Sequence, residues 1–117
     1  MQPLVLLVDD DESNRLTLEA VLEDEGYRVE CAATVAEGRT KLRDGSEPYA
    51  AALLDYNLPD GCGASLIPEL RANNPGAPAV LITGTPVDLQ ATGADAIVTK
   101  GDACDDLITL LAGYLGN

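Results

Sequence analysis

The sequence predicts an α/β domain in which helices cover both faces of a five-stranded parallel sheet. Its 117 residues suit one domain rather than two. Short apolar runs alternate with helical stretches along the chain, which is the pattern of successive strand–helix–strand units. The first apolar run, Leu4–Val8, shows no polar alternation and therefore predicts a strand buried on both faces of a sheet.

The N-terminal half is expected to contain three strands and two helices. The strands are Leu4–Val8, Arg28–Ala32 and residues 50–54, and the helices run over about residues 12–25 and 34–45. Gly26 is a natural stop for the first helix, because glycine readily adopts the left-handed conformation that ends many helices. Thr34 and Glu37 have the spacing of a capping box, which predicts the start of the second helix.

The C-terminal half is expected to contain a loop, two strands and at least two helices. The loop covers residues 55–63, a helix covers about 65–72, the strands are Ala79–Thr83 and residues 95–99, and Asp102 caps a last helix. Prolines and glycines, among them Pro59 and Gly61, mark the loop. Residues 84–93 leave little room for a helix and its connections, so a helix there should be short or irregular.

Right-handed crossovers leave few topologies for such a chain, and we expect the doubly wound strand order 2-1-3-4-5. No linker, repeat or low-complexity segment divides the sequence, so residues 1–117 are expected to form a single domain. Sheets of this kind bind ligands at the carboxyl ends of their strands. The residues that follow the predicted strands are therefore the first candidates for a functional site.

The charge of the chain limits its partners. It has 20 acidic and 7 basic residues, a formal net charge of −13. Such a surface repels nucleic-acid phosphates and anionic membranes, so we expect neither as a direct partner. The sequence has no apolar run long enough to span a membrane, and its first residues do not resemble a signal peptide, so we expect a cytoplasmic protein.

Absent residue types exclude several kinds of chemistry. Without histidine, the chain cannot build Ser-His-Asp or Cys-His catalytic sites or histidine-based zinc sites. The three cysteines, Cys31, Cys62 and Cys104, lack metal-ligand spacing and are interpreted as free thiols in a reducing compartment. No glycine-rich dinucleotide loop and no Walker-type phosphate loop is present.

Polar side chains stand at the ends of four predicted strands. They are Asp9 and Asp10, Asp55, Thr83, and Lys100. Carboxylates gathered in one crevice repel each other, and a hard cation such as Mg²⁺ would relieve that repulsion through oxygen ligands. Acids after a strand can also cap a helix or stabilise a turn. The joint placement of these groups favours a metal and phosphoryl site over that structural interpretation.

The segments that carry these residues resemble the receiver domains of two-component response regulators. The matching stretches are LLVDDDESNR (residues 6–15), AALLDYNLPDGCG (51–63), AVLITG (79–84) and GADAIVTK (93–100). Paired acids after a strand, then an Asp before an LPDGxG-like loop, then Thr, then Lys form a specific order. The resemblance implies a flavodoxin-like receiver fold over essentially the whole chain, with an atypical fourth-helix region.

The resemblance implies a magnesium site made of oxygen ligands. Asp9 and Asp10 would be the acidic pair, with Asp10 as a direct ligand and Asp9 acting mainly through water. Asp55 and the backbone carbonyl of Asn57 would complete the protein ligands. Mn²⁺ is expected to be able to replace Mg²⁺ in such a site.

The resemblance also implies a phosphoryl-transfer reaction. Asp55 would be the phosphoacceptor, and Thr83 and Lys100 would contact the phosphoryl group. The donor would be a phosphohistidine of a histidine kinase or of a histidine phosphotransfer protein. Such a protein promotes its own phosphorylation and dephosphorylation, but it is a switch rather than an enzyme, and its output would be a contact with another protein.

Residues around the phosphoryl site would tune and transmit the signal. In the family, positions equivalent to Asn57 and Thr85 influence dephosphorylation, and the small Gly84 should keep the site open to a donor. Ile97 stands where the family often has an aromatic switch residue, and Gly101 stands where a proline is usual. These departures concentrate in the half of the domain that would carry the output.

Two other interpretations are compatible with parts of the sequence. The atypical residues 84–101 allow a receiver-like interaction module that works without phosphorylation. The acids of residues 9–12 superficially resemble the nucleophile loop of haloacid-dehalogenase-like phosphohydrolases, although the chain is short for such an enzyme and Asp55 would have no role in it.

Overall fold

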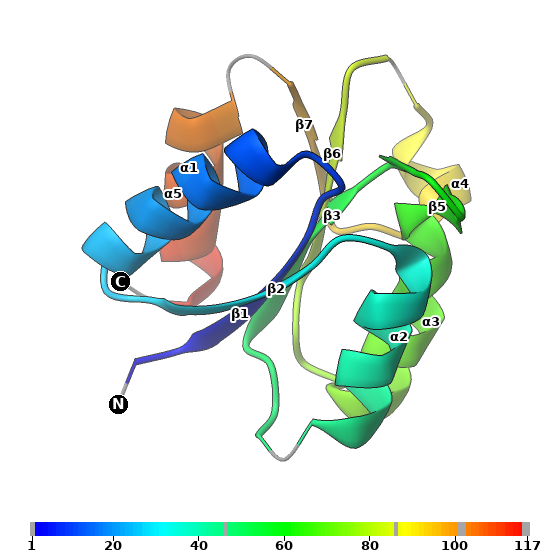
Figure 1. The fold of residues 1–117 in the computed structure, drawn as a ribbon, viewed down its shortest axis with the longest axis horizontal. Coiled ribbons are helices and arrows are strands. Elements are labelled where there is room, and N and C mark those ends of the chain that lie inside the picture. Colours follow the sequence, from blue (N-terminus) through cyan, green and yellow to red (C-terminus); the bar gives the residue numbers. More distant parts are fainter. Residues whose placement is uncertain (1, 46, 86, 101–102, 116–117) are drawn as a thin grey trace.

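The computed structural model describes residues 2–45, 47–85, 87–100 and 103–115, and a five-stranded parallel sheet lies at its centre (Figure 1). The sheet consists of β1 (Leu4–Val8), β2 (Arg28–Ala32), β3 (Ala51–Asp55), β6 (Ala79–Thr83) and β7 (Ala96–Thr99). The strand order is β2-β1-β3-β6-β7. This is the predicted doubly wound order 2-1-3-4-5, and all four strand pairs are parallel.

Helices pack on both faces of this sheet. They are α1 (Glu12–Asp24), α2 (Val35–Asp44), α3 (Ile67–Asn73), α4 (Leu89–Thr92) and α5 (Ala103–Leu115). Figure 1 shows α1 and α5 on one face and α2 and α3 on the other. Within the described ranges, no helix is both long and apolar enough to cross a membrane.

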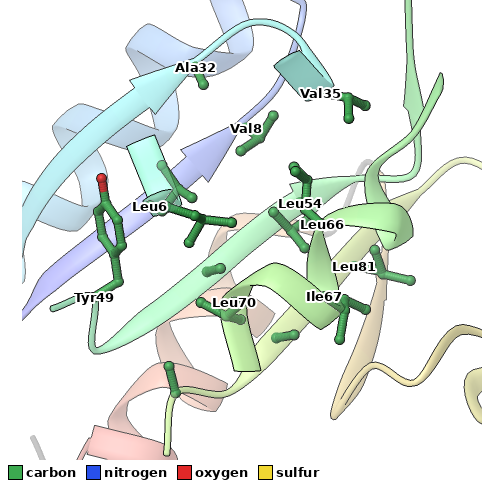
Figure 2. Packing of buried hydrophobic residues seen from close by; sticks show 14 of the residues in the cluster. Leu6, Val8, Ala32, Val35, Tyr49, Leu54, Leu66, Ile67, Leu70 and Leu81 are labelled. Atoms are coloured by element: carbon green, nitrogen blue, oxygen red, sulfur yellow. The ribbon is translucent and has the colours of Figure 1, made fainter. Parts of the chain in front are cut away.

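The core has two layers because side chains alternate along each buried strand. In β1, Val5 and Leu7 pack with Leu22 of α1 and with α5. Leu6 and Val8 point to the opposite face, where they join the side chains of α2 and α3 (Figure 2). The absence of polar alternation in Leu4–Val8 is thus explained by burial on both faces.

Side-chain caps begin the first two helices. The carboxylate of Asp11 accepts the N–H of Asn14 at 3.1 Å, and the hydroxyl of Thr34 accepts the N–H of Glu37 at 3.0 Å. The predicted capping box is present in a modified form, because the carboxylate of Glu37 accepts the N–H of Ala33 rather than that of Thr34.

Several predicted boundaries differ from the structure by one residue. The third strand runs from 51 to 55 rather than from 50 to 54, because the N–H of Tyr56 donates to the carbonyl of Ile82 at 2.8 Å and extends the ladder past Asp55. The last strand starts one residue late, because the carboxylate of Asp95 accepts the N–H of Ala79 and turns the chain there. The first helix ends one residue early.

The loop and helix predicted over residues 55–72 are more structured than expected. The loop contains the antiparallel hairpin of β4 (Asn57–Leu58) and β5 (Gly61–Cys62). The single helix expected over 65–72 is a 3₁₀ turn, Gly63–Leu66, followed by α3. Pro68 has no N–H to offer the carbonyl of Ala64, which instead accepts the N–H of Ile67 in a 3₁₀ bond.

The expected short fourth helix is confirmed. α4 has four residues, and none of them is buried. It ends at Gly93, whose φ of 77° lies in the left-handed region that glycine tolerates. Asp102, the predicted cap of the last helix, and Gly101 lie outside the described residues.

Candidate metal centre at the carboxyl edge of the sheet

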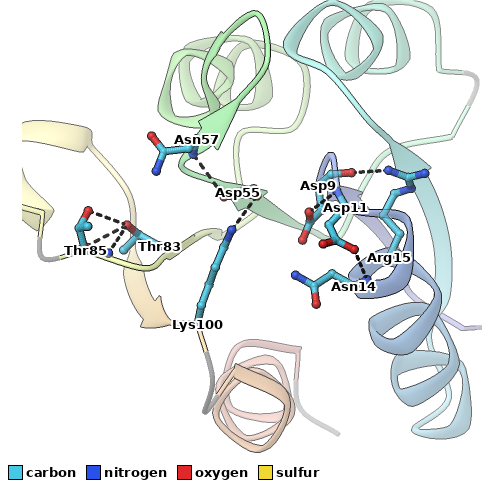
Figure 3. A network of polar contacts seen from close by, with 9 residues as sticks. All are labelled: Asp9, Asp11, Asn14, Arg15, Asp55, Asn57, Thr83, Thr85 and Lys100. Atoms are coloured by element: carbon cyan, nitrogen blue, oxygen red, sulfur yellow. Dashed lines mark hydrogen bonds and ion pairs between the residues drawn. The ribbon is translucent and has the colours of Figure 1, made fainter.

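The topology brings the predicted site residues to one edge of the sheet (Figure 3). β1 and β3 are neighbours, and Val8 pairs with Leu54, so Asp9 and Asp55 each follow a paired position. β6 lies on the other side of β3, and β7 lies beyond it. Lys100, which follows β7, donates its backbone N–H to the carbonyl of Thr83 at 2.9 Å.

Three carboxylates form a cluster at this edge. Oxygens of Asp9, Asp10 and Asp55 lie within 4.8 Å of one another. Asp9 is 1% exposed and Asp55 is fully buried, whereas Asp10 is exposed. Among the described residues, this is the group whose spacing suits a metal ion. The sequence prediction that these acids come together is therefore matched by the geometry.

Asp9 is the least satisfied member of the cluster. Its Oδ1 accepts the N–H of Asp11 at 2.9 Å, but its buried Oδ2 has no hydrogen-bond partner within the described part of the chain. Burial raises the pKa of Asp9 above its usual value, and the charges of Asp55 and Asp10 raise it further. A buried, unpaired carboxylate oxygen is costly, so the site lacks positive charge at this point.

Lys100 supplies one positive charge. Its Nζ donates to Oδ2 of Asp55 at 3.1 Å, and the lysine side chain is 38% exposed. Desolvation lowers the pKa of Lys100, but the hydrogen bond to Asp55 and the charges of Asp55, Asp9 and Asp10 outweigh it, and the net shift is upward. Lys100 therefore stays protonated beside the carboxylates at neutral pH.

The donor set fits a small divalent cation. Carboxylate oxygens are the ligands that Mg²⁺ and Mn²⁺ prefer, and Asp9 Oδ2 has free lone pairs inside the cluster. Asn57 lies next to this cluster, because its N–H donates to Oδ1 of Asp55 at 3.2 Å. Its side chain is exposed, so the backbone is the part of Asn57 that belongs to the pocket.

Thr83 is buried, but its hydroxyl does not face Asp55. It donates to the carbonyl of Thr85 at 2.9 Å and accepts the N–H of Thr85 at 3.1 Å. Figure 3 shows the Thr83 side chain directed away from Asp55 and toward Thr85. Gly84 between them is exposed, and a Cβ there would meet no heavy atom within 4 Å.

Ile97 lies away from the carboxylates. It pairs with Leu81 in the β6–β7 ladder and packs, partly buried, against the core layer of α2 and α3. None of the four residues of α4 is buried. Ile97 is therefore a packing residue in this conformation.

The sequence did not predict two side-chain contacts close to the site. Arg15 of α1 donates from its guanidinium to the carbonyl of Asp9 at 2.7 Å. Its signal was its place one turn after the cap Asp11, because helix side chains point back toward the N-terminus. The carboxylate of Asp60 in the hairpin accepts hydrogen bonds from two N–H groups of α2. No local sequence pattern predicts this long-range contact.

Comparisons with known proteins identify relatives along most of the chain. The profile of the response regulator receiver domain matches residues 5–112. The photosynthetic apparatus regulatory protein RegA of Rhodovulum sulfidophilum is 36% identical over 116 residues, covering 94% of this chain and 62% of RegA. The cell cycle transcriptional regulator CtrA of Caulobacter vibrioides is 34% identical over 111 residues, covering 89% of this chain and 46% of CtrA. The chain thus spans between about half and three-fifths of these relatives' lengths.

Solved structures share the same fold. A CheY-like receiver domain protein from Methanospirillum hungatei superposes with a TM-score of 0.88 at 32% identity, covering 99% of this chain and 95% of that one. A response regulator protein from Burkholderia pseudomallei superposes with a TM-score of 0.82 at 25% identity, covering 98% of this chain and 71% of that one. The latter structure contains a phosphorylated aspartic acid, a calcium ion and citrate.

Proposed function

This chain belongs to the family of response regulator receiver domains, and we propose that Asp55 is the residue that accepts its phosphoryl group. The observation that supports the assignment is the buried carboxylate of Asp55, which lies close to the acids that follow β1 and accepts a hydrogen bond from the ammonium of Lys100. The relative from Burkholderia pseudomallei, with its phosphorylated aspartic acid and calcium ion, supports the same chemistry. Family membership also excludes the haloacid-dehalogenase-like interpretation.

In the proposed reaction, an oxygen of the Asp55 carboxylate forms a bond to phosphorus while the phosphorus–nitrogen bond of a phosphohistidine breaks. The donor's imidazole leaves with the electron pair of that bond and takes up a proton. The hydrogen bonds from Lys100 Nζ and from the N–H of Asn57 hold the carboxylate in place. Lys100 also offsets the negative charge that collects around the transferred group.

A divalent cation belongs to this proposal. Asp9, Asp10, Asp55 and the carbonyl of Asn57 would hold Mg²⁺, or Mn²⁺ in its place. When bound, the ion would stabilise negative charge on the phosphoryl oxygens. Asp10 is exposed and accessible to an entering ion, whereas Asp9 lies inside the cluster. We propose Asp10 as a direct ligand and Asp9 as a residue that acts mainly through water, as the resemblance to receiver domains implies.

The partners of the proposed reaction follow from the family and from the composition. Receiver domains interact with histidine kinases, and this chain contains no histidine, so the phosphohistidine must come from a kinase or a histidine phosphotransfer protein. Curated relatives include transcriptional regulators that are longer than this chain. With its net charge of −13, the receiver itself would pass the signal to a protein and not contact DNA. The proposed setting is the cytoplasm.

Phosphorylation with a small-molecule donor tests this function. Wild-type protein incubated with acetyl phosphate and Mg²⁺ should gain the mass of one phosphoryl group, which hydroxylamine should remove. Asp55→Asn should show no gain, while Asp44→Asn, which changes an exposed acid at the far end of α2, should behave like wild type. Equal labelling of wild type and Asp55→Asn would refute the assignment. An unlabelled wild type would favour a module that works without phosphorylation.

A further inference from the structure

The first turn of α2 is capped by a residue from another part of the chain. The carboxylate of Asp60 accepts the N–H of Val35 at 2.8 Å with Oδ1 and the N–H of Ala36 at 3.0 Å with Oδ2. The hydroxyl of Thr34 accepts the N–H of Glu37. The first three N–H groups of α2 are thus all satisfied by side chains, two of them by Asp60 alone.

Asp60 lies at the tip of the β4–β5 hairpin, which starts two residues after Asp55. Asn57 opens this hairpin and pairs with Cys62 at its other end. Figure 1 shows the hairpin at the same end of the molecule as the start of α2. The carboxylate of Asp60 therefore ties the segment that contains Asn57 to a helix of the rigid scaffold.

The residues that flank the hairpin are held by contacts of their own, and Asn57 lies in the chain between them and Asp60. The N–H of Gly63 donates to the carbonyl of Tyr56 at 3.0 Å, and a Cβ on Gly63 would lie 2.0 Å from the carbonyl oxygen of Asp55. Nearer the tip, the side chain of Leu58 is buried and the carboxylate of Asp60 accepts its two hydrogen bonds. Among the hydrogen bonds of the described residues, those two are the ones that join the hairpin to α2.

We infer that Asp60 is a positioning residue for the metal site, because it fixes the hairpin whose first residue would offer its carbonyl to the cation. The inference rests on the proposed function, since it acts through Asn57 as a ligand. Asp60 is exposed and would touch neither the ion nor the phosphoryl group. The two N–H donors also hold the pKa of the Asp60 carboxyl below the usual value, so this carboxylate stays ionised at neutral pH.

Removing the Asp60 carboxylate should weaken cation binding, although Asp60 is not itself a ligand of the cation. We expect Asp60→Ala to raise the dissociation constant for the cation about tenfold, the lower end of the range for groups that orient metal ligands. Asp60→Asn keeps one carbonyl oxygen and should give an intermediate value. The measurement is a titration of the full chain with Mn²⁺ followed by the free-ion EPR signal, with Mg²⁺ added as a competitor.

Thr34→Ala is the matched control, because it removes a cap from the same helix without touching the hairpin. It should lower the melting temperature about as much as Asp60→Ala, yet leave the dissociation constant within about twofold of wild type. Wild-type affinity in Asp60→Ala would show that Asp60 is only a helix cap and would overturn the inference. Failure of wild type itself to bind the ion would instead overturn the metal site of the proposed function, and the positioning role with it.

Discussion

At the scale of single residues, Asp9 is the member of the carboxylate cluster whose burial is most unfavourable. Its carboxylate is buried, one of its oxygens lacks a partner among the described residues, and two other carboxylates lie close by. Asp10 is exposed, so water already solvates its charge. The two neighbours therefore differ in what they contribute to stability and to cation binding.

Substitution should separate the two roles. Without metal, Asp9→Asn should raise the free energy of unfolding by ~1 kcal/mol, because an amide removes the charge that faces Asp10 and Asp55. Asp10→Asn should change metal-free stability little, but it should remove most of the increase in melting temperature that Mg²⁺ produces in wild type. Thermal unfolding of both variants with EDTA and with Mg²⁺ measures each effect. A melting temperature of wild type that does not respond to Mg²⁺ would count against the whole metal site.

The pH dependence of the Asp9 effect has a defined sign. The pKa of Asp9 is higher in the folded protein than in the unfolded chain, so its ionisation opposes folding. This penalty is present above the folded pKa and disappears as the pH falls below the unfolded value. The stability advantage of Asp9→Asn should therefore shrink on acidification, whereas an advantage that is constant with pH would rule out charge as its cause.

The carboxylates and Lys100 could be predicted because their positions follow from backbone topology alone. Strands of a parallel sheet end on one edge, so residues just after Leu4–Val8 and just after β3 must meet there. The direction of a hydroxyl has no such signature. The sequence therefore placed Thr83 at the end of β6, but it did not show that its hydroxyl is bonded to Thr85.

At the scale of elements, the segment from Thr83 to Gly93 differs most from its surroundings. α4 is a single turn without buried residues, capped by Asp88, whose carboxylate accepts the N–H of Gln90. The hydroxyl of Thr83 is held by two hydrogen bonds to Thr85. If Thr83 turns toward a phosphoryl group on Asp55, both bonds break and the backbone after β6 loses a restraint. Few buried contacts remain to hold the segment.

Hydrogen exchange should reveal this release. We expect the described amides between residues 84 and 93 to exchange at different rates with and without beryllofluoride, a mimic of the phosphoryl group. Ile97→Ala should preserve the difference, because Ile97 is a packing residue with no ring to rotate. Thr83→Ala should abolish the difference in exchange, since it removes the hydroxyl that would turn from Thr85 toward the phosphoryl mimic. Uniform protection of 84–93 in both states would exclude a switch through this backbone.

Helices and strands were predictable where one pattern of apolar residues extends over the whole element. The strands β1, β3, β6 and β7 follow from apolar runs, and the two long helices α1 and α5 follow from helical stripes. The 3₁₀ turn and the β4–β5 hairpin escaped prediction because each involves a particular local arrangement: Pro68 lacks the N–H that would continue an α-helix, and the hairpin pairs Asn57 with Cys62 and Leu58 with Gly61. Such contacts join residues that no local periodicity connects.

At the scale of the whole molecule, stability should be divided unequally among the helices. Leu111 of α5 is fully buried in the layer that α5 shares with α1, whereas Leu89 of α4 is 42% exposed. Leu111→Ala should lower the free energy of unfolding by about 2–5 kcal/mol through lost contacts and a cavity. Leu89→Ala should stay within about 0.5 kcal/mol of wild type. Urea unfolding of the two variants checks this contrast, and a large loss from Leu89→Ala would mean that α4 belongs to the core.

The order of the strands has a consequence for when the protein can receive a signal. Asp9, Asp55 and Lys100 come from three strand ends that are distant in the sequence and meet only after the parallel crossovers have formed. Pairing parallel strands requires long loops to close, and the entropy cost of that closure comes before the stabilising contacts form. A chain in which these strands have not paired would therefore not bring the three side chains together. Phosphorylation of Asp55, as proposed, would then require β1, β3, β6 and β7 to be assembled.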